Sequence, residues 1–139
     1  MFRGRLDFCS NFYPVKFKWA DQIWWSSENA FQWSKIPASK HSEKVKSIFS
    51  KSSAAESKYL GRVVKLRIDW NTARLANMES ILYQKFNPDN GLWDLLKSTG
   101  DEELIEWNTW GDKFWGKDIN TGEGENNLGK ILMKIRDSI

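Results

Sequence analysis

Residues 17–36 read FKWADQIWWSSENAFQWSKI, and this stretch sets the first part of the fold. Two short runs rich in aromatic residues, Phe17–Trp19 and Ile23–Trp25, stand on either side of Ala20–Gln22. Aromatic and β-branched runs that flank a short polar link are typical of a β-hairpin. The sequence therefore predicts a small N-terminal hairpin.

A helix is expected to follow the hairpin at once. One of the two serines 26–27 caps its start, and Pro37 ends it near Ile36, because the residue before a proline avoids the helical conformation. Two short basic helices are expected next, at Ser42–Ser50 and at Ser53–Leu60, with Gly61 ending the second.

The clearest helical pattern runs from about Asn71 to Phe86. Its apolar residues have helical spacing and predict one buried stripe: Leu75, Met78, Leu82 and Phe86. Pro88 and Gly91 close this helix, and a short one is expected at Leu92–Lys97. A last helix is expected at about Asn127–Arg136, with its own stripe of Leu128, Ile131, Leu132 and Ile135. We expect a predominantly helical α+β fold with a small N-terminal β-sheet, forming a single compact domain over residues 1–139.

The composition narrows the kind of chemistry that the chain can use. It has 139 residues, 40% of them hydrophobic, and a mean hydropathy of −0.61, with no membrane-length apolar run and no apolar leader. Cys9 and His41 are the single cysteine and histidine, so we expect no disulfide framework, no metal site and a cytoplasmic protein. Carboxylates, a lysine or the backbone must carry any catalysis.

Tryptophan is unusually frequent, and charge is unevenly distributed along the chain. Nine tryptophans occur, of which we expect at least half to fill the core and the rest to offer faces for stacking a planar base. From Lys40 to Arg67 there are eight Lys or Arg against two Glu, whereas Asp101 to Glu125 holds eight acidic residues against two Lys. This asymmetry favours a phosphate-attracting region, although charge runs are also common on solvated faces.

Three polar side chains share one face of the helix predicted after the hairpin. Glu28, Gln32 and Lys35 are spaced four and three residues apart. Glu28 falls in the first turn, where the helix dipole favours the ionised carboxylate. A carboxylate, an amide and an amine on one face can hold a water, bind a sugar hydroxyl and attack an electrophilic carbon. The alternative is an ordinary solvated face with a Glu–Lys pair.

The irregular stretch Glu106–Gly124 lies between the last two predicted helices and is a candidate functional loop because of its length. Within it, Asp112 stands among aromatic residues and is a candidate acid, base or ribose acceptor; the alternative is an Asx turn. The glycine-rich Gly122–Gly129 opens the last helix. It either exposes backbone N–H groups to an anion or is a helix start capped by an asparagine.

Taken together, these segments resemble the YbiA-like NADAR family of N-glycosidases. The matching pieces follow in family order: Ser10–Pro14, Ser27–Lys35, Gly61–Arg62, Trp70, Lys85–Phe86, Asn108–Trp110, Asp112–Gly116, Gly122–Gly129 and Leu132–Arg136. Each piece is weak alone, but their order over most of the chain makes the resemblance specific.

The resemblance implies hydrolysis of the bond between ribose C1 and a nitrogen, in riboflavin intermediates or in ADP-ribosylated guanine, with no cofactor. By that analogy the catalytic residues are Glu28, Lys35 and Asp112. The implied substrate-binding residues are Asn11, Phe12, Phe31, Gln32, Arg62, Trp70, Asn108, Trp115, Gly116 and Asn126. The expected partner is a phosphorylated ribosyl compound or an ADP-ribosylated nucleic acid.

Two mechanisms and two other functions stay open at the level of sequence. Glu28 either activates a water molecule, or Lys35 forms a Schiff base at C1 of an opened ribose. A module that binds ADP-ribose without turnover would use the same aromatic residues. A general nucleic-acid binder would rest on the basic segment alone.

Overall fold

The computed structural model describes residues 1–139 and contains two compact units. Residues 11–85 form one unit, and residues 1–10 with 86–139 form the other. Each unit is described by itself. Neither contains a helix that is long and apolar enough to cross a membrane.

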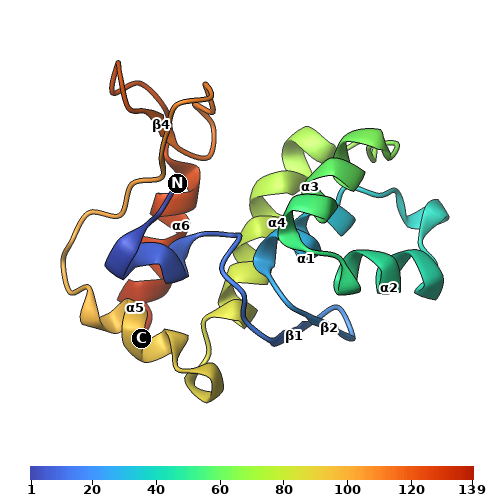
Figure 1. Ribbon diagram of the computed structural model, residues 1–139, viewed down its shortest axis with the longest axis horizontal. Helices are drawn as coiled ribbons and strands as arrows, with labels where there is room; N and C mark the ends of the chain where they lie inside the picture. The colour runs from blue at the N-terminus through green and yellow to red at the C-terminus, as the bar shows by residue number, and fades with distance from the viewer. The chain divides into compact units, whose positions relative to one another are not determined.

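The unit of residues 11–85 begins with the expected hairpin (Figure 1). Strands β1 (Phe17–Trp19) and β2 (Gln22–Trp24) pair antiparallel. Ala20 and Asp21 link them with φ values of 50° and 58°. Two successive residues with positive φ give a turn whose twist matches that of the strands. The hairpin is therefore confirmed, with its second strand starting one residue earlier than expected.

Three tryptophans pack together between this hairpin and the helix that follows. The ring centroids of Trp19, Trp24 and Trp33 lie 5.8–6.2 Å apart with tilted or edge-on planes. Trp24 and Trp33 are the only buried tryptophans of the nine, so the expectation that at least half of them fill the core is wrong. The other seven keep part of the indole ring at the surface.

Helix α1 (Ser27–Trp33) is the centre of the unit, and α2 (Glu43–Lys51), α3 (Ala54–Val63) and α4 (Trp70–Lys85) pack around it. Figure 1 shows α1 in the middle of these three helices. All seven residues of α1 are buried. A short helix covered on every side is normally apolar, yet this one reads SENAFQW.

The polar residues of α1 are accommodated because each has a defined partner. Ser26 caps the helix by accepting a hydrogen bond from the Asn29 backbone N–H. The Asn29 side chain in turn donates to the Ser52 carbonyl at 2.6 Å, which ties α1 to the end of α2. Buried polar groups are tolerated when they are hydrogen-bonded. The sequence around Ser26–Gln32 thus specifies a polar interior rather than a solvated surface.

The ends of two helices and one apolar stripe differ from the sequence-based expectation. Helix α1 ends at Trp33, three residues before Ile36, because Ser34 and Lys35 close it with tighter turns. Helix α3 runs through Gly61 to Val63. In α4, Met78 and Leu82 are buried as expected and Phe86 is buried just beyond the helix, but Leu75 is 41% exposed; Ile81 and Lys85 complete the buried side.

The other unit contains a 3₁₀ helix (Gly4–Cys9), a second 3₁₀ turn (Pro88–Asn90), α5 (Leu92–Ser98), strands β3 (Trp107–Asn108) and β4 (Lys117–Asp118), and α6 (Asn127–Asp137). Strands β3 and β4 pair parallel. The apolar stripe of α6, Leu128, Ile131, Leu132 and Ile135, is buried throughout, as its spacing predicts. The fold class, mostly helical with small sheets, is as expected.

Candidate active site

The first two residues of the predicted catalytic face are enclosed in the protein. Glu28 is 7% exposed and Gln32 is 5% exposed. The Gln32 Nε2 atom donates a hydrogen bond of 2.7 Å to Glu28 Oε1, so the amide fixes the orientation of the carboxylate. Lys35 follows in the turn after α1 and is partly buried. The alternative of a solvated Glu–Lys face is therefore wrong.

A network at the start of α1 holds the backbone of Glu28. The Asn11 carbonyl accepts a hydrogen bond from the Glu28 N–H at 2.9 Å, and the Asn11 side chain accepts one from Ser27 Oγ at 2.8 Å. The ammonium group of Lys85, which is fully buried, donates to the same Ser27 hydroxyl at 3.4 Å. Asn11 thus lies beside the predicted catalytic carboxylate.

The buried surroundings change the pKa values of both candidate catalytic groups. Burial raises the pKa of the Glu28 carboxyl, and the Gln32 hydrogen bond and the charges of Lys58 and Lys35 oppose this rise. Burial lowers the pKa of the Lys35 ammonium; Glu28 opposes this effect, whereas Arg62 and Lys58 add to it. Both shifts move the pKa of the group towards neutral pH, which suits acid–base and nucleophilic chemistry.

Aromatic faces lie beside these groups. The Trp70 ring packs on the Phe31 ring with centroids 5.2 Å apart, and Lys35 Nζ lies 6.0 Å from the Trp70 ring centroid. Lys58 Nζ lies over the Phe12 ring, 5.8 Å from its centroid. The structure therefore brings together the predicted residues of this unit: Asn11, Phe12, Glu28, Phe31, Gln32, Lys35, Arg62 and Trp70.

Gly61 has a steric role in this arrangement. A Cβ atom added at Gly61 would lie 1.8 Å from Gln32 Oε1, so only glycine leaves room for the amide between α1 and α3. The expectation that Gly61 ends α3 is wrong, because the helix continues to Val63. Gly61 lies inside the helix, at the point where α3 meets Gln32. Glycine in a helix interior costs up to about 1 kcal/mol relative to alanine, and here close packing explains it.

The remaining predicted residues lie in the other unit, where they organise the loop between α5 and α6. Asp112 Oδ1 accepts hydrogen bonds from the N–H groups of Phe114 and Trp115, which is the Asx turn weighed above. The Asn108 side chain bonds the backbone of Asp112 in both directions. Gly116 is required because a Cβ there would lie 1.9 Å from the Glu106 carbonyl oxygen.

Asn126 also has a structural part. It has a φ of 52°, its side chain accepts from the Glu106 N–H and donates to the Leu104 carbonyl, both at 2.9 Å, and it makes no side-chain cap of α6. The capping alternative for Gly122–Gly129 is therefore wrong. Catalysis by Asp112, and substrate binding by Asn108, Trp115, Gly116 and Asn126, stay predictions.

Two residues of the carboxylate environment were missed by the sequence analysis. Lys58 precedes Arg62 by four residues, a spacing that places both on one face of α3 and could have identified it. Lys85 falls on the buried side of α4, three residues after Leu82, where a lysine is out of place. No group of three or more His, Cys, Asp or Glu side chains lies close enough to hold a metal ion.

Comparison with known proteins agrees with this fold. The model of the NADAR domain family matches residues 2–139. An N-glycosidase of Nostoc punctiforme is 34% identical over 132 residues, which cover 94% of this chain and 83% of that protein. The N-glycosidase YbiA of Escherichia coli is 33% identical, with 94% and 79% covered.

A solved structure and a longer relative extend the comparison. The NMR structure of Escherichia coli YbiA superposes with a TM-score of 0.81 at 28% identity, covering 99% of this chain and 82% of that one. A riboflavin biosynthesis protein of Vibrio vulnificus is 36% identical over 134 residues, but the chain spans only 35% of its length.

The mostly helical fold shared with YbiA, together with the similarity to N-glycosidases over 94% of this chain, places the protein in the class of hydrolases that act on N-glycosyl bonds. The chain belongs to the NADAR domain family. The resemblance found in the sequence motifs is thereby confirmed.

Proposed function

We propose that this enzyme hydrolyses the bond between ribose C1 and the nitrogen of a base or amine, and that residues 11–85 supply its principal catalytic groups. The observation that carries the proposal is the enclosed Glu28 carboxylate, oriented by Gln32, with the partly buried Lys35 in the turn that follows α1. The names of the relatives support the reaction class, since two of them are N-glycosidases and one is a riboflavin biosynthesis protein.

The site offers two routes to the same products. In the first, Glu28 takes a proton from water, the hydroxide attacks C1, and the C1–N bond breaks as the leaving nitrogen is protonated. In the second, the ribose ring opens, the uncharged amine of Lys35 adds to C1, and the base leaves with a proton. Water then hydrolyses the Schiff base and returns Lys35 as an amine.

The second route explains more of the site for a substrate with a poor leaving group, such as a guanine nitrogen. An exposed lysine is protonated at neutral pH and does not attack carbon. Lys35 has a pKa below its usual range because it is partly buried and faces Arg62 and Lys58. Glu28 can accept and return the protons that this route moves. The aromatic faces of Trp70 and Phe12 suit the base or the sugar.

A turnover panel tests the function and assigns the substrate. Purified protein is incubated with ribosylaminopyrimidine phosphates, ADP-ribosylated guanosine, ADP-ribosylated DNA and NAD, and the release of the free base or amine is measured. Glu28→Gln is expected to lower turnover by about 10² or more, the usual contribution of a general acid–base group, while substrate binding persists. Binding of an ADP-ribosyl compound without turnover of any of the four would instead identify a binding module.

Reduction with borohydride during turnover separates the two routes. The lysine route predicts a sugar-phosphate adduct on the peptide that contains Lys35, and its loss in Lys35→Arg, which keeps the positive charge. No adduct, together with turnover retained in Lys35→Arg, would establish the water route.

A further inference from the structure

The face of α3 that meets α1 carries a lysine that no motif identified. Gly61 lies against Gln32, with space for no side chain between them. Lys58 and Arg62 stand three residues before and one residue after Gly61, so they are on the same side of α3 and flank this contact. Lys58 is partly buried, and its ammonium nitrogen lies over the Phe12 ring.

Groups from three helices act on Lys35. Glu28 belongs to α1, Lys58 and Arg62 belong to α3, and the uncharged Trp70 ring, whose centroid lies 6.0 Å from Lys35 Nζ, belongs to α4. In the segment before α4, Arg67 donates its backbone N–H to the Lys35 carbonyl, but its guanidinium is paired with Asp69.

Lys58 differs from Arg62 in the groups on which it acts. The positive charge of the partly buried Lys58 lowers the pKa of Glu28 and also that of Lys35, whereas Arg62, which is exposed, lowers the pKa of Lys35. A neighbouring cation favours a carboxylate over a carboxylic acid and an amine over an ammonium ion. A single charge at position 58 therefore favours the ionised acid and the free amine together.

We propose that Lys58 is a positioning residue of the active site, whose ammonium group, held over Phe12 on the α1-facing side of α3, supplies a positive charge beside Glu28 and Lys35. This inference rests on the proposed function, because the lysine route needs an ionised Glu28 and an uncharged Lys35 at its start. Lys58 acts through the other two groups and need not touch the substrate.

The first test measures the two groups without any substrate. Lys35 is labelled with acetic anhydride over a range of pH, and the extent of labelling is read by mass spectrometry of the peptide that contains it. In Lys58→Met the labelling rate of Lys35 at pH 7 is expected to fall by about threefold or more, because a like charge that lowers the pKa of Lys35 is removed. Lys58→Arg is expected to restore it.

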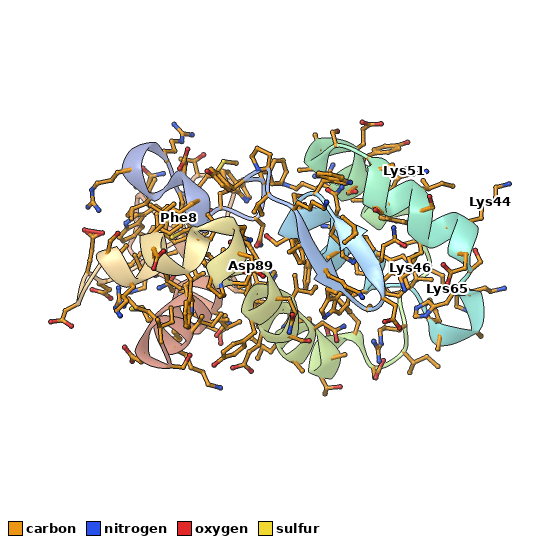
Figure 2. The ribbon with its side chains drawn as sticks, turned by 90° about the horizontal axis from the view of Figure 1, so that it is seen from below. Phe8, Lys44, Lys46, Lys51, Lys65 and Asp89 are labelled. Atoms are coloured by element: carbon orange, nitrogen blue, oxygen red, sulfur yellow. The ribbon has the colours of Figure 1, made fainter.

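Two further variants separate Lys58 from its surroundings. Arg62→Gln is expected to slow the labelling of Lys35 as well, but to leave the titration of the Glu28 carboxyl, followed by ¹³C NMR, unchanged. Lys58→Met is expected to move that titration to higher pH. Lys44→Met is the control for general loss of charge, since Lys44 is exposed and extends away from α2 (Figure 2), and it should change neither measurement.

The second test uses turnover. Removing the charge raises the pKa of both groups, so the acid limb of the kcat–pH profile is expected to move to higher pH in Lys58→Met, with activity recovered in alkaline buffer. A higher KM with an unmoved profile would overturn the proposal and make Lys58 a phosphate anchor. Unchanged labelling of Lys35 would also overturn it.

If no substrate turns over at all, the labelling and NMR results still decide the role of Lys58. Should Lys58→Met not fold, as judged by circular dichroism, Lys58→Gln takes its place.

Discussion

Glu28, the proposed catalytic carboxylate, occupies a position in which its charged form weakens the fold. Its pKa is raised mainly by burial, so the folded protein binds the carboxyl proton more tightly than the unfolded chain does. Stability is therefore lost as the pH rises through the folded-state pKa of Glu28. In its ionised form the buried carboxylate is therefore a destabilising group, and the Gln32 hydrogen bond compensates only part of this cost.

This argument predicts the stability of Glu28→Gln. Glutamine has the same shape, can accept the Gln32 hydrogen bond and carries no charge. We expect the variant to melt at a temperature equal to the wild type or higher by about 2–6 °C at pH 7, the shift that roughly 1 kcal/mol produces in a domain of this size. The difference should shrink at acid pH, where the wild-type carboxyl is protonated. Differential scanning calorimetry at both pH values tests it, and a clearly lower melting temperature at pH 7 would contradict it.

At the scale of single residues, the sequence predicted which side chains share a face of α1 but not whether that face is buried. Spacing alone placed Glu28 and Gln32 on one face of α1, and the structure joins them. It did not show that this face is buried, because SENAFQW lacks the apolar stripe that normally marks a buried helix. The burial comes from α2, α3 and α4, which are distant in the sequence. Lys58 was missed because its partners lie on other elements.

Helix packing around α1 depends on close approach at Gly61, and this gives the prediction at the scale of elements. The atom that a Cβ at Gly61 would meet is the end of the Gln32 side chain, which can move. Gly61→Ala should therefore fold with nearly unchanged stability, since alanine also favours the helix. Displacing Gln32 frees the Glu28 carboxylate, so kcat should fall by about tenfold to a hundredfold.

Gly129 of α6 is the matched control. A Cβ there would lie 2.0 Å from the Leu104 carbonyl oxygen, which is backbone and cannot move aside. Gly129→Ala is expected to lower the free energy of unfolding by about 1–3 kcal/mol, the usual cost of overpacking. Chemical denaturation of both variants, with kcat measured alongside, checks the contrast. Large destabilisation by Gly61→Ala with full activity in the remaining folded protein would refute the packing argument.

The helices were predicted with different accuracy. The α6 stripe was right in every residue because a strongly amphipathic helix has one buried side. The α4 stripe included Leu75 in error, since the first turns of α4 keep that side exposed, whereas Lys85 is buried deeper than any pattern of hydrophobicity would place it. The end of α1 was placed too late because Pro37 limits a helix without requiring it to continue that far.

Over the whole molecule, charge is divided between the two units. Residues 11–85 carry thirteen Lys or Arg against six Asp or Glu, whereas residues 1–10 with 86–139 carry eight against twelve. The unit that holds Glu28 and Lys35 is thus the basic one. A basic surface attracts phosphorylated substrates and raises their association rate. The sequence showed this asymmetry from its charge runs alone.

The composition also predicts that activity needs no metal. One histidine and one cysteine provide too few soft ligands for zinc, and the acid–base and nucleophilic groups proposed above are all organic. Dialysis against EDTA should leave kcat unchanged within error, and added Mg²⁺ or Zn²⁺ should not raise it. Activity that is lost on dialysis and restored only by a divalent ion would refute this expectation.

The contact among Trp19, Trp24 and Trp33 has an optical consequence. Indole rings whose centroids lie about 6 Å apart in tilted planes couple their electronic transitions, and such coupling adds a pair of bands of opposite sign to the far-ultraviolet circular dichroism. Those bands overlap the helical signal, so a spectrum of this protein will misstate its helix content. The contribution of the two pairs that include Trp33 arises only while the β1–β2 hairpin is seated on α1, because Trp19 and Trp24 come from the hairpin and Trp33 from the helix. Loss of that contribution as the protein unfolds therefore reports the separation of the hairpin from α1.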